Sequence, residues 1–458
     1  MLSTKKEKRK MSDSINQTDE MTVNIDQYQK ELKQAKTADN PVELSKIHEK
    51  IAKTYFEAKE YEDGLKHFDK AINQAKRIND RPLEAFYLGS KGTAYLHHKL
   101  PEEGFLCFQQ ILEIAEEIND LGLKSDALGS MGLVYMETGD PGLAIEKLRQ
   151  ALELAEELED LKRTMAQNGA LGNTYLLLAA TEDAEKHFER ALDISIELGD
   201  PQSRAGYLNN LGIIFDNSGR KSEAKLKFEE VLSISREIKD QYAERNALKF
   251  LINLELELNP HSELVLTYLE NAIALSRQLN DTREIKNYRD YQIMILLRLN
   301  RQADAISAII GELEDEDQDG DIGRKINLYS NLGNAHYDLS ELAKATEAYQ
   351  NGLDTATEHE VPAAEARLLG KLGAVCADQG EFEQGKKYTG KALKLAETLN
   401  DVPLQAEQLS LLAMTYADLN QKDKAEELAN KALELFKEAG HKLFVERIHS
   451  FLNDLKSK

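Results

Sequence analysis

Acidic side chains that could bind a metal ion gather in one short segment, which begins at Asp315 and reads DEDQDGDI. Asp315, Asp317 and Asp319 stand at the first, third and fifth places of a twelve-residue calcium loop, and a glycine stands at the sixth, where such loops turn sharply. Asp321 follows at the seventh place. The twelfth place, however, holds Ile326 instead of the glutamate that binds calcium through both oxygens. The segment is therefore either a weak calcium site or a solvated acidic turn between helices.

No other group of reactive side chains completes a site for catalysis or for a cofactor. The segment GEFEQGKK at Gly380 resembles a phosphate-binding loop, but Lys387 stands where Ser or Thr should hold magnesium. Gly380 and Gly385 are better explained as a turn residue and a small helix residue. The ten histidines show no HExxH spacing, and no Gly-x-Ser-x-Gly turn is found. Cys107 and Cys376 fit buried apolar residues of a reducing compartment. We therefore expect no enzyme and no cofactor.

Composition and charge narrow the classes of partner. The chain has 458 residues, and its formal net charge of -23 repels the phosphates of nucleic acids, so we expect no nucleic-acid partner. Its longest apolar runs are much shorter than the roughly 20 residues that cross a bilayer. No membrane insertion is expected, and a cytoplasmic location is the default. The sequence leaves the oligomeric state open, and a homo-oligomer is compatible with it.

A repeat of 40 residues runs through the chain. At one position, glycine recurs inside a helical pattern, although glycine there costs about 0.5 to 1 kcal/mol relative to alanine. The recurrence indicates that two helices approach each other closely. Each unit also ends in Asp, which can cap the next helix. The residues at this glycine position, with one residue inserted near Asn259 and Pro260, are Ala52, Gly92, Gly132, Gly172, Gly212, Ile252, Ile293, Gly333, Gly373 and Ala413.

The segment LGNTY at residues 171–175, followed by Ala184, Phe188 and Ala191, resembles the tetratricopeptide repeat (TPR) motif. The period is longer than is usual in that family, and in this respect the chain is similar to the TPR region of Pins/LGN-type adaptors and related bacterial TPR proteins. The resemblance implies an all-α fold, a right-handed superhelical solenoid of about ten helix-turn-helix repeats with half-repeat caps. The expected parts are a disordered basic and polar tail over 1–22 and a single solenoid over 23–458, with a capping helix at 23–39, repeats at 40–440 and a closing helix at 441–458.

The resemblance also implies which residues face a ligand. In TPR arrays, the first helix of each repeat lines the concave surface, through the positions six and three before, and one, four and five after, the glycine position. Asparagine recurs there, and its amide can both donate to and accept from successive peptide groups. Alternatively, asparagine is only tolerated on a wet helix face. The predicted peptide-binding residues are Asn173, Asn209, Asn246, Lys249, Asn253, Asn287, Asp290, Asn327 and Asn334.

Two further features bear on the partner. Lys249 and Asn253 are similar to part of a carboxylate clamp, but Asp290 and Met294 stand where its next basic residues are expected. The position five after the glycine is mostly acidic, which favours a protein or peptide of basic character. The residues at this position are Glu57, Glu137, Asn217, Glu257, Arg298, Asp338, Asp378 and Asp418.

The sequence thus predicts a protein-interaction scaffold or adaptor that binds peptide or protein segments along an Asn-lined, acidic-rimmed concave groove. The alternative is a peptide-sensing regulatory protein that controls an effector by a change of superhelix pitch. The repeats with Ile252 and Ile293 lack the glycine, and this irregularity marks either the binding site or simple repeat drift.

Overall fold

The computed structural model describes residue 25 and residues 27–457, apart from the side chains of 315–319 and 457. The tail predicted over 1–22 lies outside the described residues. The described chain forms two compact units, one ending at Leu254 and the other beginning at Glu255.

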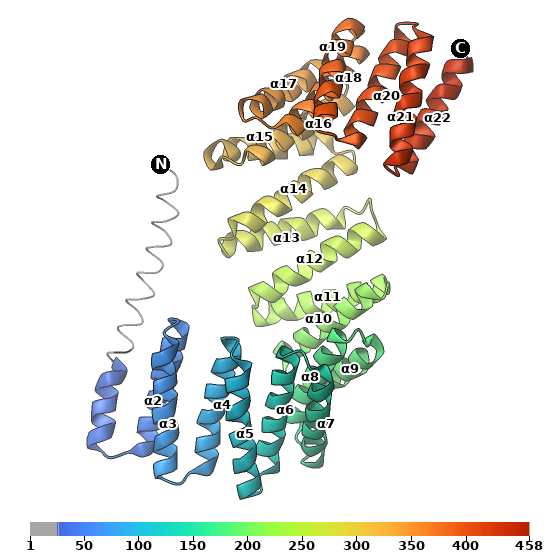
Figure 1. Ribbon diagram of the computed structural model, residues 1–458. Coiled ribbons are helices and arrows are strands. Elements are labelled where there is room, and N and C mark those ends of the chain that lie inside the picture. The colour runs from blue at the N-terminus through green and yellow to red at the C-terminus, as the bar shows by residue number, and fades with distance from the viewer. Residues whose placement is uncertain (1–24, 26, 458) are drawn as a thin grey trace. The chain divides into compact units, whose positions relative to one another are not determined.

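The first unit consists of antiparallel helices that pack on their neighbours in chain order, as Figure 1 shows for α2 to α7. A helical segment over 27–37 precedes them. Most helices have the same length and are joined by short turns. Their bounds are α2 Pro41–Glu57, α3 Tyr61–Arg77, α4 Arg81–His97, α5 Pro101–Ile118, α6 Leu121–Glu137, α7 Pro141–Glu157, α8 Leu161–Leu177, α9 Thr181–Glu197, α10 Pro201–Asn217, α11 Lys221–Ile238 and α12 Gln241–Leu258, the last of which crosses the boundary.

The second unit repeats the same plan, and again each helix packs on the next. Its helices are α13 Leu264–Gln278, α14 Thr282–Arg298, α15 Gln302–Asp319, α16 Ile322–Asp338, α17 Leu342–Glu358, α18 Pro362–Asp378, α19 Phe382–Thr398, α20 Val402–Asp418, α21 Lys422–Glu438 and α22 Lys442–Ser457. The expected all-α fold of helix-turn-helix repeats is confirmed.

The turns between helices follow one rule in both units. Aspartate caps the first helix of most repeats, as predicted: the Asp160 carboxylate, for example, accepts from the Arg163 backbone N–H at 3.0 Å. At the other end, most helices close on a residue with positive φ, such as Lys59 at 64°, which the sequence did not lead us to expect. Its N–H donates to the Phe56 carbonyl, and the next N–H donates to Tyr55, which is a Schellman motif.

The glycine position brings the two helices of a repeat together, as predicted. A methyl group placed on Gly172 would lie 2.8 Å from a ring carbon of Phe188, which packs over the glycine and is fully buried. Gly212 and Phe228 repeat this contact at the same distance. The large residue on the second helix therefore needs a small partner on the first, and this pairing forms the core of each of these repeats.

The two cysteines and the phosphate-loop-like segment have the structural roles that the sequence predicted. Cys107 and Cys376 are buried in helices, as predicted. Gly380 is the turn residue between α18 and α19, with φ of 78°. Gly385 packs against the Gly373 carbonyl, 2.9 Å from where its own Cβ would stand. Both glycines of the phosphate-loop-like segment are thus explained by the fold. No helix among the described residues is long and apolar enough to cross a membrane.

Candidate functional site

In the first unit, the first helices of three successive repeats share one pocket. It has a volume of about 840 Å³ and lies between α2, α4 and α6. It contains residues from all five positions of the repeat that the TPR resemblance assigned to the concave surface. Those residues are Lys53, Phe56, Glu57, Phe86, Gly89, Thr93, His97 and Asp126.

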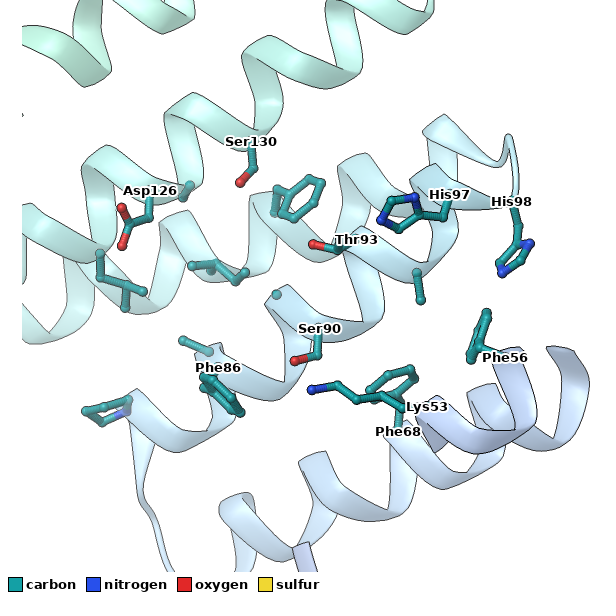
Figure 2. A pocket seen from close by; sticks show the side chains of 18 of the residues that line it. Lys53, Phe56, Phe68, Phe86, Ser90, Thr93, His97, His98, Asp126 and Ser130 are labelled. Carbon is teal, nitrogen blue, oxygen red and sulfur yellow. The ribbon is translucent and has the colours of Figure 1, made fainter. Parts of the chain in front are cut away.

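Four phenylalanine rings line this apolar pocket. Phe68 and Phe108, from the second helices α3 and α5, are buried and form its floor. Phe56 and Phe86 stand at its sides, and 55% of the Phe86 side chain remains exposed. Figure 2 shows Phe56 beside His98 at one end, where their ring centroids lie 5.1 Å apart. Exposed aromatic surface in a concave site is a common feature of ligand-binding pockets.

Polar groups surround the mouth of the apolar pocket. Lys53 forms an ion pair with Glu49 at 2.7 Å, and Asp126 forms one with Arg163 at 2.8 Å. Burial, with a smaller contribution from the neighbouring His97, lowers the pKa of His98, so this ring stays neutral at physiological pH. Among the described residues, no hydrogen bond or ion pair engages the Glu57 carboxylate.

In the second unit, three of the predicted peptide-binding residues line a common cavity. Asn287 and Asp290 on α14 and Asn327 on α16 surround a volume of about 540 Å³. Ser330 and Asn331, also from α16, complete its uncharged polar lining. The two Asn side chains are exposed. The Asn287 amide donates one N–H to the Glu284 carboxylate at 3.4 Å, which leaves its second N–H and its oxygen available to a ligand in this polar cavity.

A buried arginine, which the sequence analysis missed, lines the polar cavity together with the charged residues Arg283, Lys286, Asp290 and Asp321. Arg324 is only 8% exposed, and its guanidinium lies 2.8 Å from both Asp290 and Glu312. Asp290 is therefore partly engaged within the fold. A signal was present in the sequence: the same position of the repeat holds leucine in several other repeats, as in Leu83 and Leu404, so an arginine there should be covered and paired.

The remaining predicted residues do not join these two sites. Asn173 on α8 is exposed and Asn209 on α10 is half-buried. The Asn334 side-chain oxygen accepts hydrogen bonds from the Tyr349 hydroxyl at 2.9 Å and the Lys371 ammonium at 2.6 Å, which occupy it within the second unit. Burial lowers the pKa of Lys371.

Helix α12 carries the other three predicted residues, Asn246, Lys249 and Asn253, and all three are exposed. They belong to the first unit, whereas Asn287 and Asn327 belong to the second. A continuous ladder of asparagines through both units thus remains a prediction.

The acidic segment takes a helical path before its turn. The backbone from Asp315 to Asp319 belongs to the end of α15, and the side chains of these residues lie outside the described part. Asp321 caps α16, because its carboxylate accepts from the Arg324 N–H at 3.1 Å. Elsewhere in the described chain, no group of three His, Cys, Asp or Glu residues could hold a metal ion. Calcium binding remains a prediction.

Repeated helical hairpins with hollows on the face of their first helices define a class of repeat protein that binds through extended surfaces. Comparison with protein families agrees with this assignment. A tetratricopeptide repeat model matches residues 43–117, 162–237 and 364–438, and a second tetratricopeptide repeat model matches 127–162. Together they cover more than half of the chain, which therefore belongs to the tetratricopeptide repeat family.

Curated relatives share a limited stretch with this chain. Outer dynein arm-docking complex subunit 4 of Mus musculus is 29% identical over 114 residues, which are 25% of this chain and 18% of that protein. The Homo sapiens protein of the same name is 28% identical over 114 residues, 25% of this chain and 16% of its own length. The chain thus matches less than a fifth of the length of these relatives.

Solved structures with a similar course of the chain include two bacterial proteins. Aspartyl phosphate phosphatase F from Bacillus subtilis has a TM-score of 0.44 and 14% identity, over 73% of this chain and 93% of that one. The apo form of the quorum sensor NprR from B. thuringiensis has a TM-score of 0.38 and 15% identity, over 74% and 99% of the two chains.

Proposed function

We propose that this protein is a non-enzymatic interaction scaffold that binds segments of partner proteins along the first helices of its repeats. One observation carries the proposal: equivalent positions of neighbouring first helices surround a hollow in each unit, the apolar pocket between α2, α4 and α6 and the polar cavity between α14 and α16. Repeat proteins use such extended surfaces for binding. The curated relatives are named as subunits of a docking complex, which supports an assembly role for the matched repeats.

The polar side chains suggest how a segment would be held. The exposed amides of Asn246, Asn287 and Asn327 each offer a donor and an acceptor, which suits peptide groups irrespective of the partner's side chains. Asp338 and Asp378, at the acidic position of the repeat, are exposed in the second unit. A partner with basic residues would gain from this charge.

A crosslinking pull-down tests the proposal with matched variants. The first variant carries Asn246→Ala, Asn287→Ala and Asn327→Ala. The control carries the same change at three exposed asparagines of second helices, Asn73, Asn351 and Asn430. The first variant should lose partners that the parent and the control retain. Partners kept equally by all three proteins would contradict the role of these amides.

Salt dependence tests the expected basic character of the partner. Association between opposite charges at an exposed surface weakens as ions screen it, with a Debye length of about 8 Å at physiological ionic strength. The affinity for a captured partner should therefore fall as salt is raised. An affinity that stays constant from low to high salt would remove the acidic rim from the proposal and leave the scaffold role standing.

A further inference from the structure

The apolar pocket of the first unit exists because a glycine on one first helix and an alanine on the next leave a space that a large side chain fills in several other repeats. Gly89 on α4 lies three residues before its repeat's glycine position, and Ala127 stands on α6, the first helix of the next repeat. A methyl group placed on Gly89 would meet only the Ile111 Cδ1 atom, at 3.7 Å. The space above Gly89 is therefore open.

Equivalent glycines in other repeats are covered. A methyl group on Gly129 would lie 2.6 Å from the amide nitrogen of Gln167, and one on Gly169 would lie 2.9 Å from the ring of Tyr207. Both covering residues stand at the same spacing from their glycine as Ala127 does from Gly89. In the second unit, Gln408 covers Gly370 in the same way. Glycine at this position thus accepts a side chain, and the small Ala127 leaves that space unfilled.

The residues around the space above Gly89 favour an aromatic side chain as its occupant. Phe68 and Phe108 form its floor and Phe86 its exposed side, so an entering ring can make offset or edge-to-face contacts with other rings. In this repeat array the space above the equivalent Gly169 is filled by an aromatic ring, that of Tyr207.

The mouth of the pocket favours a peptide that also carries a basic residue. Thr93 and Ser130 line it, and within the described residues their hydroxyls form no side-chain hydrogen bond, so they can pair with peptide groups. The Glu57 carboxylate at the edge has no hydrogen-bond or ion-pair partner in the described chain, and it can pair with a cation on the bound segment.

We propose that the apolar pocket receives an aromatic side chain of a partner segment, with a neighbouring Lys or Arg of that segment paired to Glu57. This inference rests on the proposed function, because it specifies one anchor of the segment that the scaffold binds. It identifies the partner by chemistry: an aromatic residue close to a basic one, in an extended or helical segment.

Two variants alter the pocket and keep the fold: one fills it, and the other removes one of its aromatic walls. Ala127→Gln introduces the residue that covers Gly129 and Gly370 elsewhere, so the protein already contains the resulting arrangement twice. Phe86→Ala removes a largely exposed ring and leaves the buried floor intact. Tyr242→Ala is the matched control, because it removes a similarly exposed ring of the first unit that lies outside the pocket. Circular dichroism of each full-length variant verifies the helical content.

Short random peptides displayed on phage are first selected on the full-length protein. The affinities of synthetic copies are then measured by fluorescence. The protein contains no Trp, so the emission of a Trp in the peptide reports the peptide alone. The selected peptides should share an aromatic residue next to Lys or Arg. Their affinity should fall about tenfold or more with Ala127→Gln and with Phe86→Ala, as for a buried aromatic anchor, and remain unchanged with Tyr242→Ala.

The other outcomes contradict either the inference alone or the inference together with the proposed function. Peptides that bind but lack an aromatic residue, or keep their affinity in both pocket variants, would overturn the aromatic anchor and leave the scaffold role intact. Failure to select any peptide would contradict both. Sedimentation that shows a dimer of the parent, lost in Ala127→Gln, would assign the pocket to a second copy of the chain and refute the peptide as its occupant.

Discussion

Two identical substitutions at equivalent positions should have opposite effects on stability. Gly89→Ala and Gly129→Ala both add a methyl group in the middle of a helix, α4 and α6 respectively. The helix itself gains about 1 kcal/mol from each change, because alanine loses less backbone entropy than glycine. The sign of the total effect is set by what the methyl group meets.

At Gly89 the methyl group makes one ordinary contact, 3.7 Å from Ile111 Cδ1, so the full gain of about 1 kcal/mol is expected. At Gly129 it would stand 2.6 Å from Gln167, which is only 7% exposed and has little room to move. Overpacking of this kind costs about 1 to 3 kcal/mol, which leaves a net loss of about 1 kcal/mol. The two variants should thus differ by roughly 2 kcal/mol in local stability.

Hydrogen exchange measured by mass spectrometry resolves these local effects, which a single melting temperature of a repeat protein would average. Amides of α4 should exchange more slowly in Gly89→Ala and those of α6 faster in Gly129→Ala, with an overall contrast of about 30-fold for 2 kcal/mol. Adding Gln167→Ala to Gly129→Ala should restore slow exchange. Faster exchange of α4 in Gly89→Ala would show that the space above Gly89 is filled and would contradict the pocket, whereas slower exchange of α6 in Gly129→Ala would show only that Gln167 moves aside.

Three other features of the structure give separate predictions. His48 and His67 lie with their Nδ1 atoms 3.1 Å apart, and burial lowers the pKa of each from 6.5 to about 4, so their folded pair is neutral. The stability contributed by the neutral pair is complete above pH 6.5 and is lost as the pH falls towards 4, because protonation then favours the unfolded chain. In His67→Gln, the melting temperature should therefore depend less steeply on pH across this range. Ala179 has a φ of 54°, and Ala179→Gly should raise stability by about 0.5 kcal/mol, because relief of the left-handed strain exceeds the entropy of glycine; denaturant unfolding measures it. Glu312→Ala removes a carboxylate from buried Arg324 and should cost about 3 kcal/mol, visible as faster exchange in α14 and α16.

Much of the fold could be predicted because the same contact recurs at a fixed spacing. The pairing of Gly172 with Phe188 returns one repeat later as Gly212 with Phe228, so the sequence alone indicated where helices approach closely. The aspartate caps were visible for the same reason. The left-handed turn residues were not, because residues as different as Lys59, Ala179 and Asn280 adopt this conformation. There the hydrogen bonds of the Schellman motif outweigh residue preference.

The candidate sites were harder to predict because they depend on pairs of residues from different repeats. Asp290 was expected to face a ligand, but Arg324 on the next first helix also reaches it. The pocket above Gly89 likewise depends on Ala127, whose importance lies in the side chain that it lacks. Neither effect is visible at a single position of one repeat, because each depends on a side chain of the next repeat.

The pairing of positions across repeats explains how a regular array can offer different binding chemistry at each step. In the first unit, the position of Gly89 is occupied in the preceding repeat by Glu49, and the position of Ala127 is occupied there by Tyr87, whose hydroxyl bonds to Ser45 at 2.9 Å. That hollow is filled from within, whereas the next one stays open. Because the backbone spacing is constant, the size and charge of two side chains decide whether the hollow between two neighbouring first helices is filled by the protein itself or is open to a partner. Selectivity for a partner segment then follows from the order of open and filled hollows along the array. For this reason, Ala127→Gln is expected to change binding and leave the fold intact.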